Sequence, residues 1–313
     1  MVKDTISVAI ATYNGEKYLK EQLDSLYSQT LLPDEIFVSD DCSKDGTAKI
    51  LEEFRIKYGL KYVINKKSLG VNQNFEQAIR NCHGNYIIIS DQDDIWFKDK
   101  IKVTYEKLKE IELEKPAMVT SQCYQIDALG NIIDKRINIK KDTYTCADTI
   151  FSPYGVTQGC SMMFNRKLLD YLKPFPSTEV CMYDAYMGFT CASVGVKYNL
   201  ATPLMYYRRH DSNVFGKRNN NIGFFQHLID QIKNFFRPVQ FPNNRYHCLK
   251  YLENEYKDLF DKQTTLLYGR IMTYFNSSSK LEKIKSVWKI SDLSIILRIK
   301  IIISILIVNK KYE

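Results

Sequence analysis

The sequence predicts an α/β fold in which a mostly parallel sheet carries helices on both faces, followed by a basic, aromatic and helical C-terminal extension. Strand-like and helix-like segments alternate four times within the first ~115 residues, which is typical of parallel strands joined by crossover helices. Several apolar strand segments end in polar residues, and ligands of open α/β sheets bind outside those strand ends. The composition changes after Gly216, where basic and aromatic residues take over.

The first half of the predicted sheet follows from short apolar runs separated by turns and amphipathic segments. Residues 5–11 have the pattern of a buried strand, and the apolar residues of 18–26 fall at helical spacing. We expect a second strand at 36–38, a helix over about 47–58 and a third strand at 62–64.

The second half of the predicted sheet is less regular. A helix is expected after Gly70, and Tyr86–Ser90 is the fourth strand because it is a short, continuous apolar run. The pattern of 98–112 predicts a charged, exposed helix. Further elements are expected as strands at 118–125, 159–165 and 205–207, a hairpin turn at 127–131 and a helix at 183–194.

Composition narrows the class of protein and partner. The chain has 313 residues, of which 45% are hydrophobic, so it can build an ordinary core. Its net charge of +8 favours an anionic partner: a phosphorylated small molecule, an acidic membrane surface or nucleic acid. The 8 cysteines include no C-x-x-C pair, which argues against zinc and against a disulfide framework, so we expect reduced cysteines. We expect neither a signal peptide nor a transmembrane helix.

The chain is expected to divide into a sheet domain at 1–216 and a helical extension at 217–313. Isoleucine dominates residues 293–308, interrupted by Arg298 and Lys300. A helix lying at a membrane interface is our preferred interpretation of this segment. A hydrophobic helix packed on the sheet domain is the alternative.

The stretch 90–94 (Ser-Asp-Gln-Asp-Asp) carries the most chemical information, because it directly follows the fourth predicted strand. Asp91 and Asp93 point the same way along an extended segment, so both can face one ligand. Neighbouring carboxylates in a crevice need a neutralising charge, and a divalent cation that holds a diphosphate would supply it. A solvated acidic turn is the alternative interpretation of these residues alone.

A series of short motifs occurs in a specific order along the first third of the chain. They are 7–14 (Ser-Val-Ala-Ile-Ala-Thr-Tyr-Asn), 26–30 (Leu-Tyr-Ser-Gln-Thr), 40–43 (Asp-Asp-Cys-Ser), 45–47 (Asp-Gly-Thr) and 91–94 (Asp-Gln-Asp-Asp). This series resembles glycosyltransferase family 2, the inverting nucleotide-sugar enzymes with the Rossmann-like GT-A fold.

Later segments refine the resemblance, which covers roughly residues 5–216. Tyr183-Asp184 and the stretch 207–213 (Tyr-Arg-Arg-His-Asp-Ser-Asn) are similar to the bacterial rhamnosyltransferase-like branch of the family. Cys42 departs from the family, which more often has glycine there. The string 183–186 (Tyr-Asp-Ala-Tyr) also departs, since this branch often has a His-Asp-Trp-Trp-like string. The second departure bears on the sugar preference more than on the chemistry.

The resemblance implies a nucleotide-sugar donor site at the strand ends. Thr12 and Tyr13 would frame the nucleobase, with the ring of Tyr13 available for stacking. Asp41 would accept a hydrogen bond from the N–H of uracil or thymine. Asn74 would reach the donor phosphates from a helix start, and Asp91 would bind the ribose or assist Asp93.

The resemblance also implies a divalent cation, Mg²⁺ or Mn²⁺, with Asp93 and His210 as its ligands. A neutral imidazole fits Mn²⁺ better than Mg²⁺. Arg208 and Arg209 would either pair with diphosphate oxygens or form a solvated basic patch.

Asp184 is implied as the catalytic base, because inversion needs one carboxylate that takes the proton of the acceptor hydroxyl. An acidic residue favoured by the helix dipole is the structural alternative. Glu179 is the reserve candidate for the same role.

The activity implied by the resemblance is inverting, metal-dependent transfer of a sugar, with rhamnose as a candidate, from a dTDP- or UDP-sugar. The expected acceptor is a lipid-linked oligosaccharide in the synthesis of a capsule or similar bacterial cell-surface polysaccharide. The protein is then expected in the cytoplasm or peripheral on the inner face of the plasma membrane. Nucleotidyl transfer is the runner-up, but no Gly-rich phosphate loop follows the first strand. A basic nucleic-acid-binding protein is the third alternative, suggested by the net charge of +8. The sequence contains no motif typical of that class, so a nucleic-acid partner is not expected.

Overall fold

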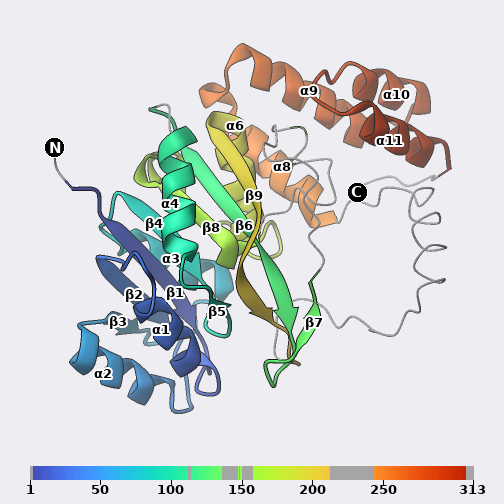
Figure 1. Cartoon of the computed structure of the whole chain (residues 1–313). Helices are drawn as coiled ribbons and strands as arrows, with labels where there is room; N and C mark the ends of the chain where they lie inside the picture. Colours follow the sequence, from blue (N-terminus) through green and yellow to red (C-terminus); the bar gives the residue numbers. More distant parts are fainter. Residues whose placement is uncertain are drawn as a thin grey trace. The chain divides into compact units, whose positions relative to one another are not determined.

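The computed structural model describes residues 3–111, 114–135, 158–211 and 243–307, together with Ala147 and Thr149. The chain divides into two compact units (Figure 1). The first comprises Met1–Tyr144 and Val156–His210, and the second comprises Thr145–Gly155 and Asp211–Glu313. The predicted boundary after residue 216 lies outside the described residues and stays a prediction.

The first unit is built on a 9-stranded sheet in the order β3-β2-β1-β4-β8-β6-β9-β5, with β7 paired to β6 (Figure 1). Four neighbouring strands are parallel: β3 (Lys61–Ile64), β2 (Glu35–Asp40), β1 (Ile6–Thr12) and β4 (Tyr86–Ser90). They lie within a few residues of the strands predicted from the apolar runs. All seven residues of β1 are buried, because it has strand neighbours on both sides and helices above and below.

The second half of the sheet mixes directions. β8 (Met162–Asn165) runs antiparallel to β4 and to β6 (Ala117–Ile126), whereas β9 (Val196–Arg208) is parallel to β6. The predicted hairpin turn at 127–131 joins β6 to β7 (Ile132–Asp134). The short strand β5 (Ile95–Trp96) pairs with β9 and was not predicted.

Helices cover both faces of the sheet, as predicted. One apolar cluster packs residues of β1, β2, β4, β6 and β8 against α1 (Leu19–Tyr27), α2 (Thr47–Tyr58) and α4 (Lys100–Ile111). The other helices, α3 (Val71–Arg80) and α6 (Tyr183–Val194), pack against each other and against strands. The fold class inferred from the sequence is therefore confirmed.

Three local expectations are wrong. Residues 159–161 form the 3-10 helix η1 (Gly159–Ser161) in front of β8 instead of continuing the strand. Helix α4, which was predicted as exposed, buries several residues, and one of them is the charged residue Lys100. Cys181 and Cys248 each take part in a disulfide, whereas five cysteines are free as expected: Cys42, Cys82, Cys123, Cys160 and Cys191.

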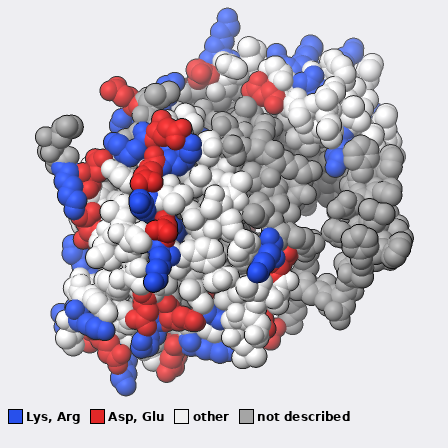
Figure 2. Space-filling model, viewed as in Figure 1, with Lys and Arg blue, Asp and Glu red and all other residues white. Residues whose placement is uncertain are grey.

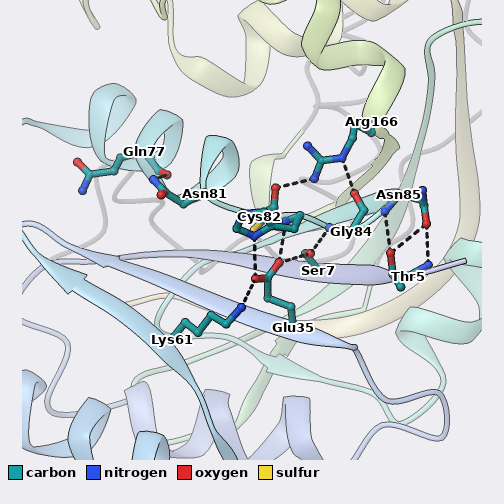
Figure 3. A network of polar contacts seen from close by, with 11 residues as sticks. Thr5, Ser7, Glu35, Lys61, Gln77, Asn81, Cys82, Gly84, Asn85 and Arg166 are labelled. Atoms are coloured by element: carbon teal, nitrogen blue, oxygen red, sulfur yellow. Dashed lines mark hydrogen bonds and ion pairs between the residues drawn. The ribbon is translucent and has the colours of Figure 1, made fainter.

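A polar network ties together the starts of the parallel strands, at the opposite end of β2 from Asp40 (Figure 3). The carboxylate of Glu35 accepts hydrogen bonds from Ser7 Oγ at 2.7 Å, Lys61 Nζ at 2.9 Å and the backbone N–H of His83 at 2.7 Å. This network fixes the register of β1, β2 and β3 relative to one another, and it therefore aligns their carboxyl ends as well.

The described part of the second unit is helical, as predicted. It contains α8 (Asn243–Tyr256), the 3-10 helix η3 (Lys257–Leu259), α9 (Lys262–Asn276), α10 (Lys280–Trp288) and α11 (Ile295–Ile307). Asp261 caps α9 by accepting a hydrogen bond from Thr264 N at 2.7 Å. α10 packs against both α9 and α11. Among the described helices, none combines the length and apolar character needed to cross a bilayer.

Candidate active site

The predicted site residues gather at the carboxyl ends of β1, β2 and β4. The register pairs Thr12 with Asp40 and Ile10 with Ser90, so these three strands end side by side. The loops that follow them carry most of the residues with candidate roles. This is the strand edge at which open α/β sheets bind ligands.

The loop after β4 is held to the end of β1 by a two-way hydrogen bond. The backbone N–H of Tyr13 donates to Gln92 Oε1 at 2.9 Å, and Gln92 Nε2 donates to the backbone oxygen of Tyr13 at 3.1 Å. The middle residue of the Asp-Gln-Asp motif therefore acts as a clamp. Because its side chain points into that clamp, Asp91 and Asp93 are free to point the other way along the chain.

Asp93 and His210, the two predicted metal ligands, are brought together. His210 Nε2 lies 2.8 Å from Asp93 Oδ2, although the residues are 117 positions apart in the sequence. Both side chains are largely buried. The ring of Tyr18 supports the imidazole, with ring centroids 4.9 Å apart.

Arg208 holds the acidic loop in place through hydrogen bonds rather than facing a ligand. Its backbone N–H donates to Asp94 Oδ1 at 3.1 Å, and its Nε donates to the backbone oxygen of Asp93 at 2.9 Å. Its Nη2 forms an ion pair with Glu21 at 2.5 Å. Arg208 is 2% exposed in this arrangement, which makes it a framework residue of the loop instead of part of a solvated basic patch.

The site carries more negative charge than its own residues offset. Burial, together with the charges of Asp93 and Asp184, raises the pKa of Asp91 to about 7. Burial and the neighbouring carboxylates also raise the pKa of Asp94 well above its ordinary value, and Asp94 Oδ2 has no hydrogen-bond partner among the described residues. Ligand atoms of Asp91, Asp94 and Cys160 lie within 4.8 Å of one another.

This surplus of buried carboxylate charge fits a divalent cation. A cation beside Asp91 and Asp93 would offset the repulsion that raises the pKa of Asp91. Carboxylate oxygens together with an imidazole nitrogen form a donor set suited to Mn²⁺, and acceptable to Mg²⁺ through the oxygens. The residues present therefore fit the predicted cofactor.

Lys100 supplies the buried positive charge beneath this cluster, and the sequence interpretation missed it. Its Nζ donates to the backbone oxygen of Cys160 at 2.6 Å and lies 3.9 Å from the centroid of the Trp96 ring. Burial lowers the pKa of Lys100 to about 8, although nearby groups including Asp94 oppose the shift. Only its position directly after the acidic loop could have indicated this role.

Asp184 lies in the first turn of α6, and its carboxylate is close enough to raise the pKa of Asp91. Burial raises the pKa of Asp184 to about 6, while backbone N–H groups of Ala185 and Gly159 oppose the shift. Its residue surface remains partly exposed. A carboxylate with a pKa near neutrality and access to solvent has the properties of a general base. The reserve candidate, Glu179, lies on an exposed turn.

Asp41 is engaged by the loop that precedes α3. Its two oxygens accept hydrogen bonds from Ser68 Oγ at 2.7 Å, Leu69 N at 2.6 Å and Gly70 N at 3.0 Å, with Asn65 Nδ2 at 3.3 Å. Burial would raise the pKa of Asp41, but these donors lower it. The carboxylate is therefore ionised and oriented, and its contact with a nucleobase stays a prediction.

Asn74 links three strand ends from within α3. Its Oδ1 accepts from Ser39 Oγ at 2.7 Å and from Asn65 Nδ2 at 3.1 Å, and its Nδ2 donates to the backbone oxygen of Thr12 at 3.2 Å. The side chain is 3% exposed. This geometry supports a framework role, and the predicted contact with donor phosphates stays untested.

Thr12 and Tyr13 differ in exposure. Thr12 is buried and its Oγ1 donates to Asp40 Oδ1 at 2.7 Å, whereas the ring of Tyr13 is 56% exposed beside the strand ends. An exposed aromatic at this edge offers a face for stacking. Cys42 has φ 63°, a left-handed conformation that favours glycine, which explains why glycine is more usual at this position of the motif.

The fold and the acidic site at its strand ends are typical of a nucleotide-dependent transferase. Known proteins that resemble this chain belong to the same class. The model of the family named Glycosyl transferase family 2 matches residues 7–172, just over half of the chain. The chain is also 31% identical over 232 residues to the dTDP-rhamnosyl transferase RfbG of Shigella flexneri, covering 69% of this chain and 75% of that protein. The chain therefore belongs to glycosyltransferase family 2, and it is a glycosyltransferase.

Two solved structures share the fold. The crystal structure of S. aureus TarS 1–349 in complex with UDP-GlcNAc superposes with a TM-score of 0.57 at 18% identity, covering 96% of this chain and 89% of that chain. The mannosyltransferase PcManGT from Pyrobaculum calidifontis, in complex with GDP-Man and Mn²⁺, gives a TM-score of 0.50 at 19% identity, covering 98% and 86%. The GT-A fold expected from the motifs is thus confirmed.

Proposed function

We propose that this glycosyltransferase transfers a sugar with inversion, using a divalent cation, from a dTDP- or UDP-sugar to a lipid-linked oligosaccharide. Rhamnose is the first candidate sugar, since the relative from Shigella flexneri is a dTDP-rhamnosyl transferase. The product would extend a bacterial cell-surface polysaccharide such as a capsule, at the cytoplasmic face of the membrane.

The observation that carries the proposal is that His210 Nε2 lies 2.8 Å from Asp93 Oδ2 in the acidic loop after β4, while Asp184 stands apart from that pair in the first turn of α6. One group of carboxylates can hold the donor diphosphate through a cation, while a separate carboxylate stays available for the acceptor. This division of roles is what an inverting transfer needs.

Asp93 and His210 would hold the cation, with Asp91 turned toward the donor ribose. The cation, when bound, supplies positive charge that stabilises the departing nucleoside diphosphate. Asp184 takes the proton of the acceptor hydroxyl as that oxygen forms a bond to the anomeric carbon. The bond from that carbon to the diphosphate oxygen breaks on the opposite face, which inverts the configuration.

The base would be placed by its neighbours on α6. Gly159 allows the approach of Tyr183, whose hydroxyl would lie 1.8 Å from a Cβ at position 159. The ring of Tyr183 stacks on Phe75 with centroids 4.0 Å apart. The start of α6 is thus fixed beside η1, and Asp184 is fixed with it.

Membership of a sugar-transferring family favours this proposal over nucleotidyl transfer. The test is to incubate the protein with dTDP-rhamnose or with UDP-sugars, with Mn²⁺ or with EDTA, and to measure release of the nucleoside diphosphate in the presence of a lipid-linked saccharide. We expect acceptor-dependent release of dTDP or UDP that EDTA abolishes. Release of pyrophosphate from nucleoside triphosphates, with no release from any nucleotide sugar, would contradict the proposal.

A further inference from the structure

Helix α11 buries only one side within the helical unit. Ile301, Ser304 and Ile305 are at most 5% exposed, and α10 packs against this helix. Lys280 Nζ donates to the backbone oxygen of Leu306 at 3.0 Å, which satisfies a carbonyl at the C-terminal end of α11. The helix is therefore anchored in its unit by one face and by its end.

The opposite side of α11 exposes an apolar stripe, here called the α11 stripe. Its members are Ile295 at 55%, Ile296 at 61%, Ile299 at 43% and Leu306 at 56% exposure. At 3.6 residues per turn these side chains lie within an arc of about 120°. Between them lie Ile302 and Ile303, which are partly exposed. A contiguous apolar patch of this kind marks an interaction surface.

Cationic side chains border the α11 stripe on both sides. At helical spacing Arg298 and Lys300 fall about 100° to either side of Ile299. The Arg298 guanidinium donates to the backbone oxygens of Ile290 at 2.7 Å and Leu293 at 3.1 Å, and lies 5.5 Å from the Trp288 ring.

The rest of this border is also basic and aromatic. Trp288, which lies beside Arg298, is 55% exposed, and Lys280, which bonds to Leu306, is exposed as well. Elsewhere on α10 and at its end Lys285, Lys289 and the acidic Glu282 are exposed. In Figure 2 blue side chains of this helical unit lie beside white, uncharged surface, with fewer red side chains among them. Across residues 243–307, Lys and Arg outnumber Asp and Glu.

We propose that the α11 stripe is a docking surface for an anionic lipid bilayer, on which α11 lies with its isoleucines in the acyl boundary and the exposed lysines of the helical unit among the headgroups. An apolar face bordered by Lys and Arg is typical of helices that lie in a membrane interface. Trp and long cationic side chains are suited to the same border, since each combines an apolar part with a polar tip. An apolar stripe alone would suit a protein partner equally well. The basic border favours a membrane, because anionic headgroups attract Lys and Arg side chains.

This inference deepens the proposed function, because a lipid-linked acceptor would be reached from the membrane surface. Vesicle binding requires neither donor, cation nor catalysis. The two proposals can therefore fail separately.

The experiment is vesicle co-sedimentation of the full chain. Vesicles of phosphatidylcholine mixed with phosphatidylglycerol are compared with vesicles of phosphatidylcholine alone. The test variant is Ile296→Gln with Ile299→Gln, which removes apolar surface but keeps good helix formers. The matched control is Ile56→Gln with Leu129→Gln, at positions that are 72% and 85% exposed elsewhere on the chain.

We expect the wild type and the control to bind the anionic vesicles. The stripe variant should bind at least about tenfold more weakly, because membrane binding scales with the apolar area buried, and a loss of about 1.4 kcal/mol of binding free energy lowers the partition constant about tenfold. All three should release nucleoside diphosphate equally with a water-soluble acceptor. Equal vesicle binding by the stripe variant and wild type, or no binding by the wild type, would overturn the proposal. Concentration-dependent dimers that the stripe variant abolishes, without lipid binding, would instead assign the surface to a second copy.

Discussion

Replacing Asp184 by Asn should remove the proposed base while leaving the site otherwise intact. The side chain keeps its volume, and the amide oxygen can still accept the Ala185 N–H that now donates to Asp184 Oδ1 at 2.7 Å. A positioned general base contributes about 10²–10⁴-fold to a rate. We therefore expect kcat to fall by about that factor, while donor affinity stays close to that of the wild type.

The pH profile gives a magnitude that follows from the structure. Burial raises the pKa of Asp184 from 3.8 to about 6. With that pKa, about nine tenths of the base is ionised at pH 7 and about one tenth at pH 5. The wild-type kcat/KM, which reports the free enzyme, should thus fall about tenfold between pH 7 and pH 5, whereas an ordinary aspartate would remain mostly ionised over this interval.

The assay is steady-state release of nucleoside diphosphate over a range of substrate concentrations, which gives kcat for the comparison of variants and kcat/KM for the pH profile of the free enzyme. Glu179→Gln is the matched control, because it changes the reserve candidate on an exposed turn and should leave both kcat and the pH profile of kcat/KM unchanged. Full activity of Asp184→Asn would refute the assignment. A loss of activity in Glu179→Gln alone would move the base to that residue.

Three further predictions concern the framework of the sheet and of the site. Burial of Glu35 would raise its pKa, but three hydrogen-bonding neighbours lower it from 4.5 to about 2, so its contribution to stability is present above pH 4.5 and is lost as the pH falls toward 2. Glu35→Gln should lower the free energy of unfolding at pH 7 by up to about 3 kcal/mol and flatten its dependence on pH in denaturant titrations, and an unchanged slope would contradict this. Lys100→Met should remove the buried charge next to the acidic cluster and lower the free energy of unfolding by about 3 kcal/mol. Saturating Mn²⁺ should recover part of that loss. If the melting temperature of the variant does not respond to Mn²⁺, Lys100 does not balance the charge of the cluster. Cys42→Gly should relieve the left-handed conformation at φ 63° and raise the free energy of unfolding by up to about 1 kcal/mol, so a lower melting temperature would show that the Cys42 side chain outweighs the strain.

The sequence was most informative where burial is continuous. Strands β1 and β4 are short apolar runs ended by polar residues, and both were predicted nearly to the residue because both faces of the sheet are covered. Strand β9 was predicted only at its end, since its pairing with β6 contains register shifts that break the simple alternation. Strand β5 has two residues, too few for a periodic signal.

Within the site, residue type and position located the acids but not their hydrogen bonds. The pairing of Asp93 with His210 followed from the family resemblance, and the structure brings the two together. The engagement of Asp41 and Asn74 by neighbouring loops depends on side-chain geometry across several strand ends, which no local pattern encodes. Lys100 was assigned to a charged, exposed helix, and apart from its position after the acidic loop only its tertiary packing against Trp96 reveals that it is buried.

The most direct test of the account is thermal stabilisation by UDP, dTDP and GDP, with and without Mn²⁺, measured on the wild type and on Asp93→Ala. Ligand at about 100 times its dissociation constant adds about 2.7 kcal/mol to the stability of the native state, which is a shift of a few degrees. Asp24→Ala serves as the control, because it removes an exposed carboxylate on α1 that pairs only with Lys20 at 2.7 Å among the ion pairs described. The account predicts a Mn²⁺-dependent shift with UDP or dTDP but not with GDP, kept in the control and lost in Asp93→Ala. No shift with either pyrimidine nucleotide, or an equal shift in Asp93→Ala, would contradict a cation-dependent donor site at the end of β4.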